Sequence, residues 1–186
     1  MSGGVSRSTK SHVLATITEV FREHGYSATT LSKLTEATGL QKASLYHYFP
    51  KGKNEMALVV LDSILEQLQD KILNCLNEKV SPKKRLFRML KAIGEFYKGG
   101  QLLCFITVFS IGDLDKNCRK NLKLAVEKWI KLLAKTLEEA KLPKSENKAY
   151  AVLATLQGSL ILARTLNDPD IFLMCLDQLS DDWNLT

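Results

Sequence analysis

The polar residues best suited to chemistry in this 186-residue chain lie together between Gln41 and Tyr46. Helical spacing directs Leu45 and Phe49 inward and leaves the neighbouring side chains on the outer surface. Glutamine and lysine side chains bind base edges, an alanine methyl contacts the methyl group of thymine, and hydroxyls bind phosphates. This pattern is typical of a surface that reads the major groove of DNA. The outer residues are Gln41, Lys42, Ala43, Ser44 and Tyr46.

Two short helices must position these residues. The segments 30–38 and 41–48 both have helical spacing, and Gly39 between them suits a tight turn because glycine adopts positive φ readily. Two short helices joined by such a turn form a helix-turn-helix. Contacts to the DNA backbone are expected from residues next to the two helices. These are Thr29, Thr30, Lys51 and Lys53.

The stretch TLSKLTEATGLQKASLYHYFPKGKNE, residues 30–55, resembles the signature of the TetR family, with LYHYF as its most characteristic part. The PKGK that follows is similar to the branch that includes regulators of multidrug-resistance and efflux genes. The resemblance implies that residues 41–47, His47 included, form the recognition helix. It also implies that Tyr46 and Tyr48 lie near phosphates and that Lys53 begins a fourth helix. Gln41 departs from the Ser or Thr that caps this helix in many relatives.

The rest of the chain is also predicted to be helical, because apolar residues recur at helical spacing and no alternating strand pattern is found. We therefore expect an all-α fold of about nine helices. Gly25 is expected to end the first helix in a left-handed cap, Ser81 and Ser145 to cap two later helices, and residues 181–183 to fray. The expected helices cover about 9–24, 30–38, 41–48, 54–77, 82–98, 101–111, 116–141, 145–166 and 168–179.

The resemblance implies two domains: a helix-turn-helix DNA-binding domain over 1–53, and a ligand-binding and dimerisation domain over 54–186. It further implies that the last two helices pair with their copies in a four-helix interface. The segment 149–166 is apolar nearly all round, as a helix buried on more than one side would be. A fully buried central helix in a monomer is the alternative. The expected interface residues are Leu153, Leu156, Leu160, Ile161, Ile171, Phe172, Cys175 and Leu179.

A small-molecule effector of unknown identity would bind in the larger domain. Apolar and aromatic residues there are candidates for a ligand cavity, although residues of these types more often form plain core. Cys104 is interpreted as a buried, inert thiol, because apolar neighbours raise a thiol pKa. The candidates are Phe87, Leu90, Phe96, Tyr97, Cys104, Phe105, Phe109, Trp129, Tyr150 and Gln157.

The net charge, the length of the apolar runs and the spacing of the cysteines limit the kinds of function that this chain can be expected to have. A formal net charge of +6 favours a polyanionic partner. The longest apolar run, 102–111, is well short of the roughly 20 residues of a membrane span. The first ten residues lack the apolar core of a signal peptide, and the four cysteines form no Cys-x-x-Cys pair, so we expect a cytoplasmic protein with reduced thiols.

Catalysis is not expected, and neither is a metal or cofactor. The three histidines are His12, His24 and His47, so the larger half has none for base chemistry or metal binding, and no glycine-rich phosphate loop occurs. The overall expectation is a dimeric, ligand-responsive repressor on a palindromic operator. The alternative is a small-molecule-binding or scaffold protein with a vestigial DNA-binding head. An activator also remains open, because the sign of regulation depends on operator position.

Overall fold

The computed structural model describes residues 10–110 and 114–185. Across these ranges the chain forms nine α-helices and two 3-10 helices and contains no strand, which confirms the all-α expectation. The elements are α1 (Lys10–Ala28), α2 (Leu31–Thr38), α3 (Lys42–Tyr48), α4 (Lys53–Lys71), η1 (Leu73–Asn77), α5 (Pro82–Phe96), η2 (Lys98–Gly100), α6 (Phe105–Ser110), α7 (Lys116–Glu139), α8 (Ser145–Leu166) and α9 (Asp170–Asp182).

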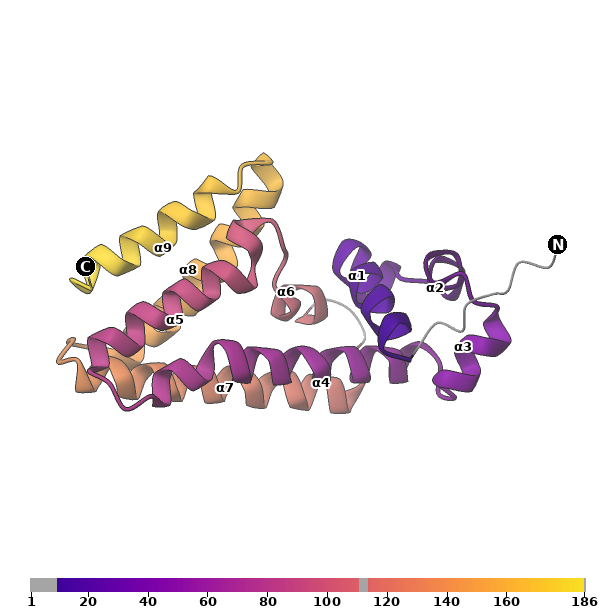
Figure 1. Cartoon of the computed structure of the whole chain (residues 1–186), viewed down its shortest axis with the longest axis horizontal. Helices are drawn as coiled ribbons and strands as arrows, with labels where there is room; N and C mark the ends of the chain where they lie inside the picture. Colours follow the sequence, from indigo (N-terminus) through magenta and orange to yellow (C-terminus); the bar gives the residue numbers. More distant parts are fainter. Residues whose placement is uncertain (1–9, 111–113, 186) are drawn as a thin grey trace.

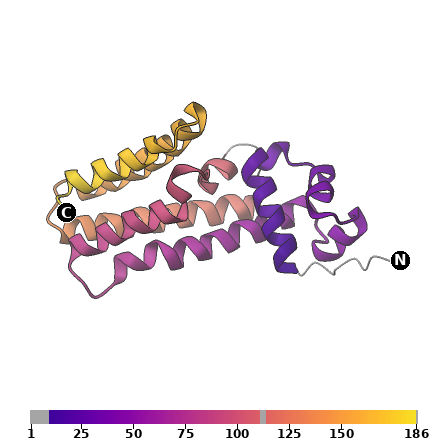
Figure 2. The same cartoon turned by 45° about the horizontal axis from the view of Figure 1, so that its top comes forward.

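The molecule is elongated, with α1, α2 and α3 gathered as a head at one end (Figure 1). Helix α4 leads from the head into a larger body, where α7 runs beside it. Helices α5, α8 and α9 form the other side of the body, and α8 packs on both α7 and α9. Short helix α6 contacts α1 and lies where the body meets the head (Figure 2). The head is therefore attached to the body through both α4 and α6.

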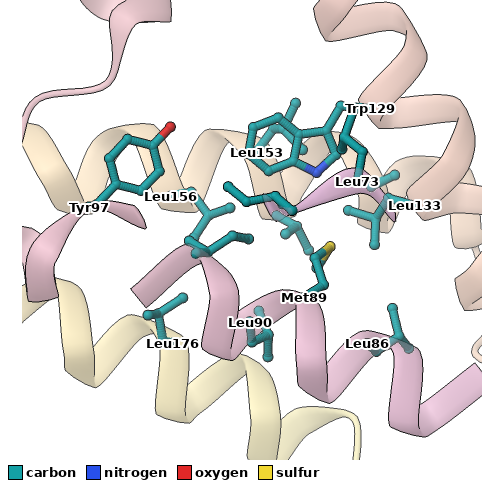
Figure 3. Packing of buried hydrophobic residues seen from close by; sticks show 14 of the residues in the cluster. Leu73, Leu86, Met89, Leu90, Tyr97, Trp129, Leu133, Leu153, Leu156 and Leu176 are labelled. Atoms are coloured by element: carbon teal, nitrogen blue, oxygen red, sulfur yellow. The ribbon is translucent and has the colours of Figure 1, made fainter. Parts of the chain in front are cut away.

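Two clusters of buried side chains stabilise this arrangement. In the body, Trp129 of α7 packs among leucines and Met89 from η1, α5 and α8 (Figure 3). The second cluster begins in the head with Phe21 and Phe49, continues into α4, and includes Phe105 and Phe109 of α6. Burying a large apolar side chain contributes about 1.5–3 kcal/mol. The apolar core of the head is thus continuous with α4 and α6.

The predicted start of α5 is confirmed, whereas the predicted cap at Gly25 is wrong. Ser81 caps α5, with its Oγ accepting from the backbone N–H of Lys84 at 3.4 Å, and Pro82 occupies the first turn. Gly25 departs from helical geometry but is not a left-handed cap (φ 74°, ψ 168°), and α1 resumes as far as Ala28. The reason is Tyr26, which is buried and stacks on Phe21 with ring centres 6.1 Å apart.

The C-terminal helices differ from the prediction in two details. Ser145 is the first residue of α8, and its hydroxyl donates to the carbonyl of Leu142 at 2.8 Å instead of capping the helix. Residues 181–183 are ordered, because Trp183 is only 2% exposed and packs into the body core. Helix α9 consequently extends to Asp182, beyond the predicted end near Leu179.

Two predicted helices are also shorter than expected. The segment predicted as one helix over 54–77 changes to 3-10 geometry after Lys71. The segment 101–111 is helical only over Phe105–Ser110, and the predicted ends at residues 9 and 111 lie outside the described residues.

Helix α8 has the length and apolar composition of a membrane span, a test that the core helix of a globular body also passes. No other described helix does so. The contacts of α8 with α7 and α9 make it a central element of this body.

Candidate functional site

The head contains a helix-turn-helix whose two helices are joined as predicted. Thr30 caps α2, with its Oγ1 accepting from the N–H of Lys33 at 3.3 Å. Gly39 adopts the left-handed conformation in the turn (φ 67°, ψ 10°). Leu34 of α2 and Leu45 of α3 are fully buried, so the two helices pack on the same core.

Helix α3 presents one polar face to solvent. Leu45 and Phe49 are fully buried, as their spacing predicted. Gln41 is the N-cap residue but makes no side-chain capping bond, in line with its departure from the Ser or Thr of many relatives. Contact of this face with DNA stays a prediction. The exposed residues are Gln41, Lys42, Ala43, Tyr46 and His47, and Ser44 and Tyr48 are half-buried.

The turn after α3 determines how Tyr46 lies. Gly52 has a φ of +66°, a conformation that L-residues rarely adopt. A Cβ at this position would lie 3.3 Å from Cε1 of Tyr46. The glycine of the PKGK sequence therefore permits both the turn and the close approach of the Tyr46 ring.

The residues predicted to bind the DNA backbone occupy two environments. Thr30 and Lys51 are exposed next to α2 and α4. Thr29 is fully buried, and its hydroxyl donates to the carbonyl of Gly25 at 2.7 Å. Lys53 is half-buried, and its Nζ donates to the backbone carbonyls of Tyr26 and Thr29 at 3.1 and 3.0 Å. The sequence analysis did not predict the two contacts of Lys53, which join residues more than twenty positions apart.

The predicted dimer residues also divide into two groups. Leu153, Leu156, Leu160 and Phe172 are buried in the chain's own core, in one cluster with residues of α5 and α7. Ile161 is 44% exposed, and the other three residues, Ile171, Cys175 and Leu179, are half-buried.

An exposed apolar surface lies on the side of α8 that faces away from the core leucines Leu153, Leu156 and Leu160, and it continues onto α9. Small residues Ala151, Ala154 and Gly158 recur along this side of α8 at helical spacing, a signal that could have identified it from sequence. Its large apolar members are Tyr150, Ile161, Leu162 and Leu166 of α8, with Leu173 and Met174 of α9.

The structure does not gather all candidate ligand residues at one place. Phe87 and Tyr150 are exposed on the outside of the body. Phe105 and Phe109 belong to the cluster shared with the head, and half-buried Phe96 packs against both clusters. The remaining candidates lie in or beside the body core. They are Leu90, Tyr97, Cys104, Trp129 and the half-buried Gln157.

A small polar group does occur within that core. The hydroxyl of Tyr97 lies 3.0 Å from Sγ of Cys104, and Thr107 donates to Oε1 of Gln157 at 3.1 Å. Burial raises the pKa of both the Tyr97 hydroxyl and the Cys104 thiol, so both remain protonated near neutral pH. Nε1 of Trp129 is buried without an acceptor among the described residues.

Two of the larger hollows are at the surface. One of about 700 Å³ lies between α7 and α8 and includes Tyr150. Another of about 550 Å³ lies between α1 and α4 and includes Phe96 and Arg22. Within residues 10–110 and 114–185, no group of three or more His, Cys, Asp or Glu side chains is placed to hold a metal ion.

Comparisons with known proteins agree with this head and body. Residues 13–60 match the model of the bacterial regulatory proteins of the tetR family. The HTH-type transcriptional regulator LmrA of Bacillus subtilis (strain 168) is 25% identical over 175 residues, covering 89% of each chain. The HTH-type transcriptional repressor DhaR of Mycobacterium sp. (strain GP1) is 28% identical over 162 residues, covering 82% of this chain and 80% of DhaR.

The fold is also that of solved TetR regulators. The crystal structure of a TetR transcriptional regulator from Legionella pneumophila aligns with a TM-score of 0.80 at 20% identity, covering 96% of this chain and 99% of that one. The reduced form of NemR from E. coli aligns with a TM-score of 0.73 at 18% identity, covering 92% and 95%. Residues 13–60 therefore form a helix-turn-helix domain of the TetR type, and the chain as a whole is similar to TetR-family transcriptional regulators.

Proposed function

We propose that this regulator is a dimeric repressor that binds a palindromic operator and is released by a small-molecule inducer. The observation that carries the DNA-binding part is the division of α3, which buries Leu45 and Phe49 while exposing Gln41, Lys42 and Ala43 at its start. Side chains at the start of a recognition helix contact base edges when the helix enters the major groove. A repressor role is supported by the relative DhaR. We also propose that the protein acts in the cytoplasm and has no catalytic activity, as a DNA-binding repressor would.

Backbone contacts would come from the exposed residues around α3. Lys51 is exposed in the turn before α4 and would bind a phosphate as a point charge. Thr30 at the start of α2 is also exposed. Tyr46, with its ring against Gly52, and His47 complete the surface. Phosphate contacts of this kind fix the register of α3, and the base-facing residues provide sequence preference.

Dimerisation would use the apolar face of α8 and α9. An exposed row of large apolar side chains on one side of two neighbouring helices is typical of an interface between copies. The small residues Ala151, Ala154 and Gly158 would let the partner's helix approach closely. A two-fold dimer places two heads on one DNA molecule, which recognises half-sites about 34 Å apart.

The effector would bind in the body near Tyr97, Cys104, Gln157 and Trp129. The polar group among these side chains and the unpaired indole N–H of Trp129 would serve a ligand that carries a hydrogen-bond acceptor. Cys104 directly precedes α6, which contacts the head through Phe105 and Phe109. A ligand that favours one position of α6 would therefore change the orientation of the head, by as much as its preference for that state.

The experiment is a mobility shift with the DNA upstream of the protein's own gene and a scrambled duplex of equal composition, at two salt concentrations. A specific regulator retains its preference for the upstream DNA at the higher salt. Equal binding to both duplexes that disappears at the higher salt would contradict the proposal and favour a scaffold with a vestigial head.

A further inference from the structure

The end of α1 and the beginning of α4 meet at an internal lysine. Lys53 is the first residue of α4, yet its ammonium points back into the head and donates to the carbonyls of Tyr26 and Thr29. The same ammonium lies 4.4 Å from the centre of the Tyr26 ring. One cation is thus held by two carbonyl oxygens and one aromatic face.

Neighbouring contacts strengthen this junction. The hydroxyl of Tyr26 donates to Oδ1 of Asn54, the second residue of α4. The buried hydroxyl of Thr29 donates to the carbonyl of Gly25, which fixes the connection between α1 and α2. The junction therefore ties the start of α4 to the connection between α1 and α2.

We propose that Lys53 is a positioning residue that locks the DNA-binding head to α4, and that it does not contact phosphate. Carbonyl oxygens near a helix C-terminus carry partial negative charge, and a cation held there is stabilised. The aromatic face adds a cation–π contribution. Because three contacts converge on one ammonium, a tilt of α4 is transmitted to α1, α2 and α3 as a rigid unit. This inference rests on the proposed function only for its consequence, which is that movement of the body changes DNA binding.

Lys51 supplies a matched comparison. It is two residues away and carries the same charge, but its side chain is exposed, and only its backbone N–H is engaged, with Oε2 of Glu55 at 2.8 Å. Lys51→Met removes an exposed cation, whereas Lys53→Met removes the junction. Lys53→Arg keeps a cation with several donors and should restore the lock. Lys53→Gln keeps one donating group and should give an intermediate result.

The first measurement needs no DNA. Nitroxide labels are attached at Glu36→Cys on α2 and Glu66→Cys on α4, two exposed positions, in a background with Cys75→Ser and Cys175→Ser. The label-to-label distance distribution is recorded by pulsed electron spin resonance, with excess unlabelled protein to isolate pairs within one chain. We expect a narrow distribution in the parent protein, in Lys51→Met and in Lys53→Arg, and a broad one in Lys53→Met. An equally narrow distribution in Lys53→Met would overturn the proposal.

The second measurement is the salt dependence of binding to the upstream duplex. A lost phosphate contact lowers the slope of log affinity against log salt by about one. Lys51→Met should show this decrease and Lys53→Met should keep the parent slope. A slope lowered equally by Lys53→Met would identify Lys53 as a phosphate contact and reject the lock. If the parent protein shows no preference for upstream DNA, the regulator proposal fails, but the distance measurement still decides the role of Lys53.

Discussion

The guanidinium carbon of Arg22 in α1 lies 4.8 Å from the centre of the Phe105 ring in α6. This cation–π contact joins the head to the body at a point separate from the Lys53 junction. The side chain of Arg22 is only 15% exposed, and its ion pair with Glu19 is long, at 4.0 Å. Nε of Arg22 is buried without a partner among the described residues. Packing against Phe105, more than ion pairing, is therefore what Arg22 contributes.

The first prediction concerns this contact. Arg22→Ala should lower the free energy of unfolding by about 1–2 kcal/mol, because it removes both the cation–π contact and the packing of the aliphatic stem. Arg22→Met should cost less than about 1 kcal/mol, because it keeps an apolar stem and removes an unpaired buried N–H. Urea titration measures both. An equal loss in the two variants would show that the charge, and not the stem, stabilises the joint.

A second prediction concerns base recognition by α3. Lys42→Ala should weaken binding to the operator by about 1–3 kcal/mol and relax sequence preference at one position, as expected for a lysine at a base edge. Its thermal midpoint should be unchanged, because Lys42 is exposed. The affinity is measured by titration against operator and against single-base variants. A uniform weakening on all duplexes, including scrambled DNA, would instead assign Lys42 to a phosphate.

Helix α3 has the core and surface faces that its sequence predicts. Leu45 and Phe49 are buried as their spacing required, and Gly39 takes the left-handed turn, since local periodicity and backbone sterics determine both. Lys53 shows the limit. Its position predicted the start of α4 to within one residue, but its partners Tyr26 and Thr29 are set by the packing of α4 against α1, which local sequence does not encode.

The same limit applies to α8. Its all-round apolar character was visible, but which leucines face the core depends on where α5, α7 and α9 pack. Helical spacing alone therefore does not distinguish the leucines of a dimer surface from Leu153, Leu156 and Leu160, which lie in the chain's own core. Trp183 is a similar case. The acidic residues Asp181 and Asp182 before it predict a frayed end, but the Trp183 indole packs into the core of the body, which is built from residues distant in the sequence.

A third prediction follows from Cys118, which is fully buried on α7. Burial, with Asp115 and Asp62 nearby, raises the pKa of its thiol from 9.0 to about 11. Well below pH 9 the thiol is protonated in both the folded and the unfolded chain, so its ionisation does not change stability. Between pH 9 and about 11 the unfolded chain releases the proton and the folded chain does not, so stability falls as pH rises.

Cys118→Ala should reduce this alkaline loss. The measurement is the free energy of unfolding from urea titrations at pH 8 to 11, compared as the slope against pH, because the substitution also removes packing at every pH. Identical slopes in the parent protein and in Cys118→Ala would mean that the folded thiol ionises at its ordinary pKa. Cys104→Ala is the natural companion, since burial raises the pKa of that thiol as well.

The last prediction tests the dimer face with two leucines of matched exposure. Leu162 on α8 is 51% exposed and Leu124 on α7 is 52% exposed, so replacing either by glutamate costs the isolated chain little. Only Leu162 belongs to the apolar row proposed to meet a partner. Leu162→Glu would bring like charges together across a two-fold axis and bury them, which should convert the dimer to monomers in sedimentation experiments. Leu124→Glu should leave the dimer intact.

Loss of the dimer should also be visible on DNA. A monomer engages one half-site at a time, so Leu162→Glu should weaken operator binding by about a hundredfold or more, while Leu124→Glu stays near the parent affinity. Binding to a duplex with a single half-site should be nearly equal in all three proteins, because the reading surface of α3 is untouched. A dimer that persists in Leu162→Glu would place the interface elsewhere. If Leu124→Glu were the variant that dissociates, α7 would take that role.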